Sequence, residues 1–64
     1  MPQIGHRVRV TFRDGRVREG ILVDMYTECF IYLHMVIRFD DGETVDLCIN
    51  DISEGVACVE DLEM

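Results

Sequence analysis

Residues 7–20 read RVRVTFRDGRVREG, and this stretch predicts a β-hairpin. In its first half every second side chain is apolar, which is the period-two pattern of a strand with one buried face. These apolar residues are Val8, Val10 and Phe12. Asp14-Gly15 then supplies a tight turn, because glycine tolerates a positive φ and aspartate tolerates a sharp bend. The chain should return as a second strand over residues 16–25, where Gly20 indicates a bend or a bulge.

The same alternation continues beyond this hairpin. A third strand is expected over residues 29–40, CFIYLHMVIRFD, with largely apolar side chains on both faces. Asp41-Gly42 makes the next turn, and a fourth strand covers residues 44–49. Residues 50–55, NDISEG, predict one tight helical turn, and a short last strand follows over residues 56–59 before an acidic tail. The pattern therefore predicts an all-β fold.

The length and composition set the scale of that fold. A chain of 64 residues has room for a single domain, residues 1–64, with one small core. Self-association would add to the marginal stability of such a domain. No stretch approaches the roughly 18 uninterrupted apolar residues of a membrane span, and the start MPQIGHRVRV lacks the apolar region of a signal peptide. We therefore expect a cytoplasmic protein with no membrane contact.

Two stretches resemble the sequence motifs of the Sm family. Residues 19–33, EGILVDMYTECFIYL, resemble the first Sm motif, with glycine and leucine framework positions at Gly20, Leu22 and Leu33. Residues 48–59, CINDISEGVACV, resemble the second motif, with apolar framework positions at Ile49, Ile52 and Val56. The resemblance implies a small five-stranded, strongly bent antiparallel barrel of the Sm-like or SH3-like kind, with one short helical turn.

The chain departs from the family's RNA pocket. The family uses an Asp and a Met-Asn pair where this chain has Tyr26 and Cys29-Phe30, and an Arg-Gly pair where it has Asn50-Asp51. Uridine binding in the Sm manner is therefore not expected, although Tyr26 or Phe30 could stack on a base. The VTFRDG hairpin, the IRFDDGETVDL strand pair and the acidic charge also resemble the small acidic Sm-like regulators that bind and inhibit transcription termination factor Rho. That resemblance implies a protein partner.

Positive charge is concentrated in the first hairpin. Residues 1–18 hold five arginines and one acidic residue, a net charge of +4, whereas residues 19–64 hold one arginine and twelve acidic residues, a net charge of −11. We expect cross-strand pairing to gather the five into one patch for anion binding or assembly. They are Arg7, Arg9, Arg13, Arg16 and Arg18. Three uses stay open: pairing with the chain's own acids, assembly with an acidic partner or another copy, and phosphate binding to a nucleotide or nucleic acid.

The acidic residues and the third strand supply two further candidate surfaces. The carboxylates either keep a small protein soluble or enter a basic groove on a partner protein. The candidates on this acidic face are Asp40, Asp41, Glu43, Asp46, Asp51 and Glu54. The second apolar face of the third strand is expected to form the interface of a dimer or ring. Its members are Phe30, Tyr32, His34 and Val36.

Motifs of catalysis and of metal binding are missing from the sequence. Cys29, Cys48 and Cys58 are odd in number and have no CxxC spacing, so we expect buried or half-buried free thiols and neither a disulfide scaffold nor a zinc ribbon. No nucleophile elbow or phosphate-binding glycine loop is present, and His34 is expected to be a packed or interface histidine. No cofactor, no metal and no enzymatic activity are expected.

The sequence thus predicts a non-enzymatic protein-interaction module. Its expected role is that of a small acidic regulator or inhibitor of a larger nucleic-acid-handling protein, of the kind that phages or plasmids encode. The alternative is an oligomeric Sm-like barrel that binds a nucleotide or short RNA through the arginine hairpin and exposed aromatic side chains.

Overall fold

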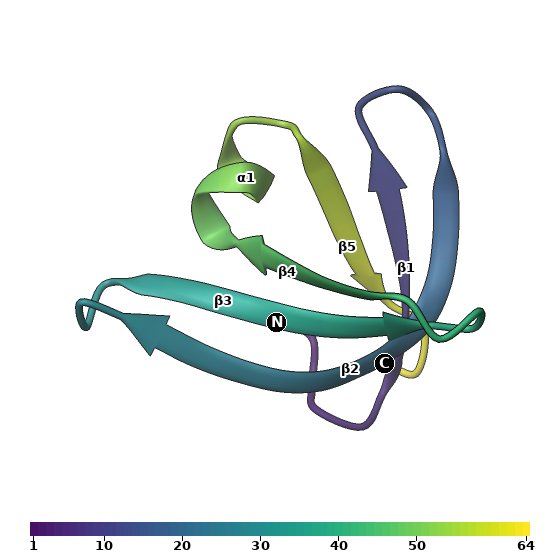
Figure 1. Ribbon diagram of the computed structural model, residues 1–64, viewed down its shortest axis with the longest axis horizontal. Helices are drawn as coiled ribbons and strands as arrows, with labels where there is room; N and C mark the ends of the chain where they lie inside the picture. Colours follow the sequence, from purple (N-terminus) through teal and green to yellow (C-terminus); the bar gives the residue numbers. More distant parts are fainter.

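The expected strands form one antiparallel sheet in the computed structural model, which describes residues 1–64 (Figure 1). The elements are β1 (Arg7–Phe12), β2 (Val17–Glu28), β3 (Tyr32–Phe39), β4 (Thr44–Cys48), α1 (Ile49–Ser53) and β5 (Ala57–Asp61). The strand order is β4-β3-β2-β1-β5, so β4 and β5 are the edges, and no ladder of backbone hydrogen bonds joins them. The expected all-β class, with five antiparallel strands and one short helical element, is confirmed.

The core lies on the concave side of this bent sheet. Every strand contributes at least one buried side chain to it, because alternate side chains of a strand point to the same face. The eight buried side chains of the core are Val8, Val10, Leu22, Met35, Ile37, Phe39, Leu47 and Ala57. The short helix α1 packs against β3, β4 and β5. No helix has the length and apolar character that crossing a membrane requires.

The bend of β2 has two separate causes. The register between β2 and β3 shifts between Leu22 and Asp24, which marks a bulge. Of the bend or bulge expected at Gly20, the bulge lies three residues further along the chain. Gly20 instead allows a close approach of two backbones, because a Cβ there would lie 2.2 Å from the carbonyl oxygen of Arg38. Only glycine fits this crossing of β2 and β3.

The turns between strands differ in their chemistry. Gly15 and Gly42 have φ values of +92° and +90°, as the two Asp-Gly turns predict. The third strand begins at Tyr32 and not at residue 29, because Cys29 and Phe30 form the β2–β3 turn with φ values of 52° and 63°. This left-handed conformation is costly for residues other than glycine, asparagine and aspartate.

Candidate interaction site

The five hairpin arginines do not form one patch. In the pairing of β1 with β2, Arg9 lies opposite Glu19, whereas Arg18 lies opposite the buried Val10. Residues directly opposite each other in an antiparallel pair have side chains on the same face. Arg7 and Arg9 therefore lie on the outward face and Arg18 on the inward face. The expected gathering of all five by cross-strand pairing is wrong.

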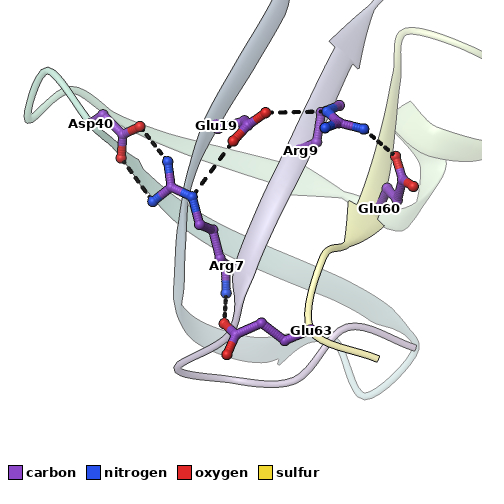
Figure 2. Close-up of polar contacts among 6 residues, drawn as sticks. All are labelled: Arg7, Arg9, Glu19, Asp40, Glu60 and Glu63. Atoms are coloured by element: carbon purple, nitrogen blue, oxygen red, sulfur yellow. Dashed lines mark hydrogen bonds and ion pairs between the residues drawn. The ribbon is translucent and has the colours of Figure 1, made fainter.

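The two outward arginines belong to an alternating ladder of charges (Figure 2). Arg7 donates to Asp40 (Nη1···Oδ1 3.2 Å) and lies 3.5 Å from Glu19 (Nε···Oε1). Arg9 approaches the same Glu19 (Nε···Oε2 3.3 Å) and Glu60 (Nη1···Oε1 3.2 Å). The hydrogen bond to Asp40 raises the pKa of Arg7 above its ordinary value. We call the set Asp40, Arg7, Glu19, Arg9 and Glu60 the ion ladder.

The inward arginine closes the end of the core. The guanidinium carbon of Arg18 lies 3.9 Å from the ring centroid of Phe39, a cation–π arrangement. Its two terminal nitrogens donate to Glu43 (2.7 Å) and Asp41 (2.8 Å). The hydrogen bond to Glu43 raises the pKa of Arg18 above its ordinary value.

The remaining two hairpin arginines also have partners within the chain. Arg13 donates to the backbone carbonyl oxygens of Glu54 (2.6 Å) and Gly55 (3.3 Å), at the end of α1. Arg16 donates to Asp14 (Nε···Oδ2 2.8 Å). The backbone amide of Arg16 bonds to Asp14 as well and holds the pKa of that carboxyl below its usual value. Every arginine of the hairpin is thus bound by the chain's own oxygen atoms.

The six candidate acidic residues fall into three groups. Those in the β3–β4 turn, Asp40, Asp41 and Glu43, lie together, and each bonds to Arg7 or Arg18. Asp46 lies on the outward face of β4. Asp51 accepts a hydrogen bond from the backbone amide of Cys48 (3.0 Å) at the start of α1, and Glu54 follows the helix. The structure brings three of the six together and separates the others.

A polar cluster on the outward face of β2, β3 and β4 was not foreseen from the sequence. The ring of His34 stacks on that of Tyr26, with centroids 4.6 Å apart and planes 7° from parallel. Its Nδ1 lies 2.8 Å from Asp46 and its Nε2 lies 3.1 Å from Glu28. Both nitrogens face carboxylates, and only the imidazolium donates from both. We call these residues, Tyr26, Glu28, His34 and Asp46, the histidine cluster.

The hydrogen bonds within the histidine cluster shift the pKa values of its members. The hydrogen bond to Asp46, followed by that to Glu28, raises the pKa of His34 above its ordinary value. The hydroxyl of Tyr26 also donates to Asp46, which raises the pKa of Tyr26 to about 12. The bonds from Tyr26 and His34 lower the pKa of Asp46. The cluster ties three neighbouring strands together on their outer face.

Beyond this cluster the β2–β3 hairpin ends in exposed apolar side chains. Phe30 is 97% exposed and Ile31 is 70% exposed, and Tyr32 beside them is also exposed. Of the interface expected on the third strand, Phe30 and Tyr32 lie at this tip, whereas His34 and Val36 lie further along the hairpin and are half-buried. We call residues 29–32 the hairpin tip.

Three further features of the structure are candidates for a site: a pocket, the cysteines and the metal-ligating residues. An apolar pocket of about 200 Å³ lies next to α1 and is lined by Met1, Pro2, Leu33, Met35, Ile49, Ile52 and Val59. Cys29 and Cys58 are exposed and Cys48 is half-buried, so the expectation of covered thiols is wrong for two of the three. No three His, Cys, Asp or Glu residues are grouped to hold a metal ion.

Comparison with known proteins identifies no relative, so the function is inferred from the geometry of the structure. No family model, no curated protein and no solved structure matches this chain.

Proposed function

We propose that this protein is a non-enzymatic protein-interaction module, a small acidic regulator that binds a larger nucleic-acid-handling protein. In this proposal the hairpin tip is the anchor, and the exposed carboxylates on the adjoining part of β2, Asp24 and Glu28, select a basic partner. The bent sheet, with α1 packed against both edge strands, would then be a small barrel of the Sm-like or SH3-like kind that displays the hairpin.

One observation carries the proposal: the most exposed apolar side chain between the termini lies in a costly backbone conformation. Phe30 is 97% exposed and has a φ of 63°, next to Cys29 at 52°. Asparagine and glycine would form this turn at lower free energy, and they would not expose an aromatic ring. Strain at an exposed aromatic position favours a binding role, since aromatic side chains supply much of the contact energy at protein interfaces.

Electrostatics supports a basic protein partner over a polyanion. The net charge of −7 attracts positively charged surfaces and repels nucleic acid. A phosphate group would have to displace Asp40 or Glu19 from Arg7 and Arg9, because these carboxylates already bind the guanidinium groups. The exposed rings of Tyr26, Phe30 and Tyr32 could still stack on bases, which is the basis of the alternative function.

A capture experiment with tip variants tests the proposal. Wild-type protein, the double variant Phe30→Ser/Ile31→Ser and the control Val17→Ser are used as baits in lysate of the source cells, with and without nuclease. Val17 is a suitable control because it is another exposed apolar residue, 54% exposed, and lies at the start of β2, far from the tip. We expect one nuclease-insensitive protein that wild type and Val17→Ser retain and the double variant loses. Equal capture by all three baits would contradict the proposal, and nuclease-sensitive nucleic acid on the bait would favour the alternative.

Self-association through the same tip is a separate proposal. Phe30, Ile31 and Tyr32 on two copies could pack together and cover apolar area that one copy exposes. Light scattering at micromolar concentration should then give a mass above 7.4 kDa that the Phe30→Ser/Ile31→Ser variant lowers to the monomer value. A wild-type mass equal to that of the monomer would reject it.

A further inference from the structure

Strand β2 is paired on both sides over only part of its length. Its paired residues with β1 end at Ile21, and the last backbone bonds on that side are both made by Leu22, whose amide donates to the carbonyl of His6 and whose carbonyl accepts from the amide of Gly5. Its pairing with β3 continues to Glu28. Residues 23–28 therefore form a free strand edge. Figure 1 shows this end of β2 extending away from β1 and β5, with β3 on its one paired side.

The backbone along this edge is ready to accept another strand. In an antiparallel pair, alternate residues direct their N–H and C=O groups toward the partner strand and the others direct them away. The amide of Met25 donates to the carboxylate of Asp24 (2.9 Å), which places Met25 on the side away from β3. Thr27, two residues on, shares that orientation. Asp24 thus occupies the position at which the carbonyl oxygen of an added strand would accept.

The side chains along the edge specify the charge of that strand. Asp24, Tyr26 and Glu28 alternate with Met25 and Thr27, so all three lie on the outward face, and all three are exposed. A second copy paired antiparallel about Tyr26 would place Asp24 opposite Glu28, and like charges directly opposite each other are destabilising. Lysine or arginine at those two positions would form ion pairs instead. In this register the edge is complementary to a basic segment and not to itself.

We propose that residues 23–28 of β2 bind an extended, basic segment of a partner protein by strand addition. The segment adds a strand beside β2, carries Lys or Arg opposite Asp24 and Glu28, and places an apolar or aromatic side chain opposite Tyr26. On binding, the hydrogen bond from the amide of Met25 to the carboxylate of Asp24 breaks. The amide of Met25 then donates to a carbonyl oxygen of the segment, and the carboxylate of Asp24 forms an ion pair with a Lys or Arg of the segment. This inference rests on the proposed function and names the chemistry of the partner.

Binding of a short peptide tests strand addition directly. The probe is the blocked peptide TKVYVKT, and the controls are TEVYVET and TKVYVKT with N-methyl groups on the backbone amides that face β2. We expect calorimetry to detect the lysine peptide and hydrogen exchange at the Thr27 amide to slow when it binds. The glutamate peptide should not bind, and N-methylation should weaken binding on the order of tenfold or more, since each methyl group removes a donor from the new ladder.

Two protein variants complete the test. Thr27→Pro removes the free amide at an edge position that tolerates proline, and Thr27→Val keeps the amide with a similar side-chain volume. We expect Thr27→Pro to lose at least on the order of tenfold in affinity and Thr27→Val to match wild type. If Thr27→Pro does not fold, the N-methylated peptide gives the same information with wild-type protein.

The opposite results would overturn strand addition. Equal binding of the N-methylated and unmodified lysine peptides would mean that the peptide binds through its charge and not through backbone hydrogen bonds. No binding of the lysine peptide at millimolar concentration would reject the edge as a site. Failure of the peptide together with tip-dependent capture of a partner would reject this inference and leave the proposed function in place. Failure of both would reject both.

Discussion

The two halves of β2 have opposite surroundings. Residues 17–22 bond to β1 and the residues just before it, and from Gly20 onward they pair with β3 as well; they include the buried Leu22 and the glycine on which the backbone of β3 packs. Residues 24–28 pair with β3 alone and have exposed Asp24, Tyr26 and Glu28 on their outer face. A bulge between Leu22 and Asp24 separates the two halves. One strand therefore joins the core of the protein to its candidate binding surface.

This comparison shows how a chain of 64 residues can expose apolar side chains and still fold. The small core is built from the paired half of β2 and its neighbours, and the hairpin tip contributes nothing to it. Changes at the tightly packed positions of the paired half should act on stability, whereas changes at exposed positions of the free half that make no side-chain contact with the core or the histidine cluster should act on binding. The predictions below test that division.

The largest effect is expected for Gly20→Ala. The new methyl group would lie 2.2 Å from the carbonyl oxygen of Arg38 and 2.7 Å from the Cα of Phe39, and neither backbone atom can move without disturbing the sheet. We expect a loss of about 3 kcal/mol or more in the free energy of unfolding, which is most of the roughly 3–5 kcal/mol available to a domain of this size. Urea denaturation followed by circular dichroism measures it.

The matched change in the free half is Thr27→Ala. It lies on the same strand but at an exposed position, so we expect a change of about 0.5 kcal/mol or less in the free energy of unfolding. Equal destabilisation by the two variants would show that both halves of β2 support the core, against the division made above.

Most of the fold was predictable from local patterns. Period-two alternation and the two Asp-Gly turns predicted β1, β4 and their turns closely, because these patterns depend only on neighbouring residues. The β2–β3 turn was missed because Cys29 and Phe30 are not turn-forming residues and the apolar alternation runs on to both sides of them. The role of Gly20 depends on a contact with a distant strand, which no local pattern contains.

The candidate site was predictable only in part. The exposed aromatic residues and the acidic residues were identified by type, but their grouping depends on register. A register shifted by one residue would have placed Arg18 opposite Arg9, whereas the observed register places it opposite Val10. In the same way, Tyr26 meets His34 only because the turn falls at residues 29–31.

The second prediction concerns the hairpin tip, where a substitution should raise the free energy of unfolding instead of lowering it. Replacing Cys29-Phe30 by Asn-Gly supplies the residues that a turn with two positive φ values favours. We expect the free energy of unfolding to rise by about 1 kcal/mol, because the relief of the left-handed strain exceeds the entropy cost of glycine. The same variant should lose the captured partner. A destabilised variant would show that Phe30 contributes to folding and remove the argument that strain at the tip serves binding.

The third prediction is a dependence of stability on pH that comes from His34. Its pKa is raised in the folded protein above the ordinary 6.5, so its stabilising effect is complete below pH 6.5 and is lost as the pH rises through the raised value. Urea midpoints from about pH 6 to about pH 9 should fall for wild type, and His34→Gln should reduce that fall. Parallel curves for the two proteins would mean that the histidine cluster does not couple protonation to folding.

The smallest effects are expected for two arginines, Arg9 in the ion ladder and Arg18 at the end of the core, and their dependence on salt should differ. Arg9→Gln removes two exposed ion pairs, to Glu19 and Glu60, so its small effect on the thermal midpoint should vanish as salt screens the charges. Arg18→Gln removes a guanidinium that is stacked on Phe39 as well as paired with Asp41 and Glu43. Because the stacking contact covers an apolar ring and is not screened like an exposed ion pair, part of its effect should persist in high salt. The same salt dependence for both variants would place Arg18 among the surface charges and contradict its assignment to the end of the core.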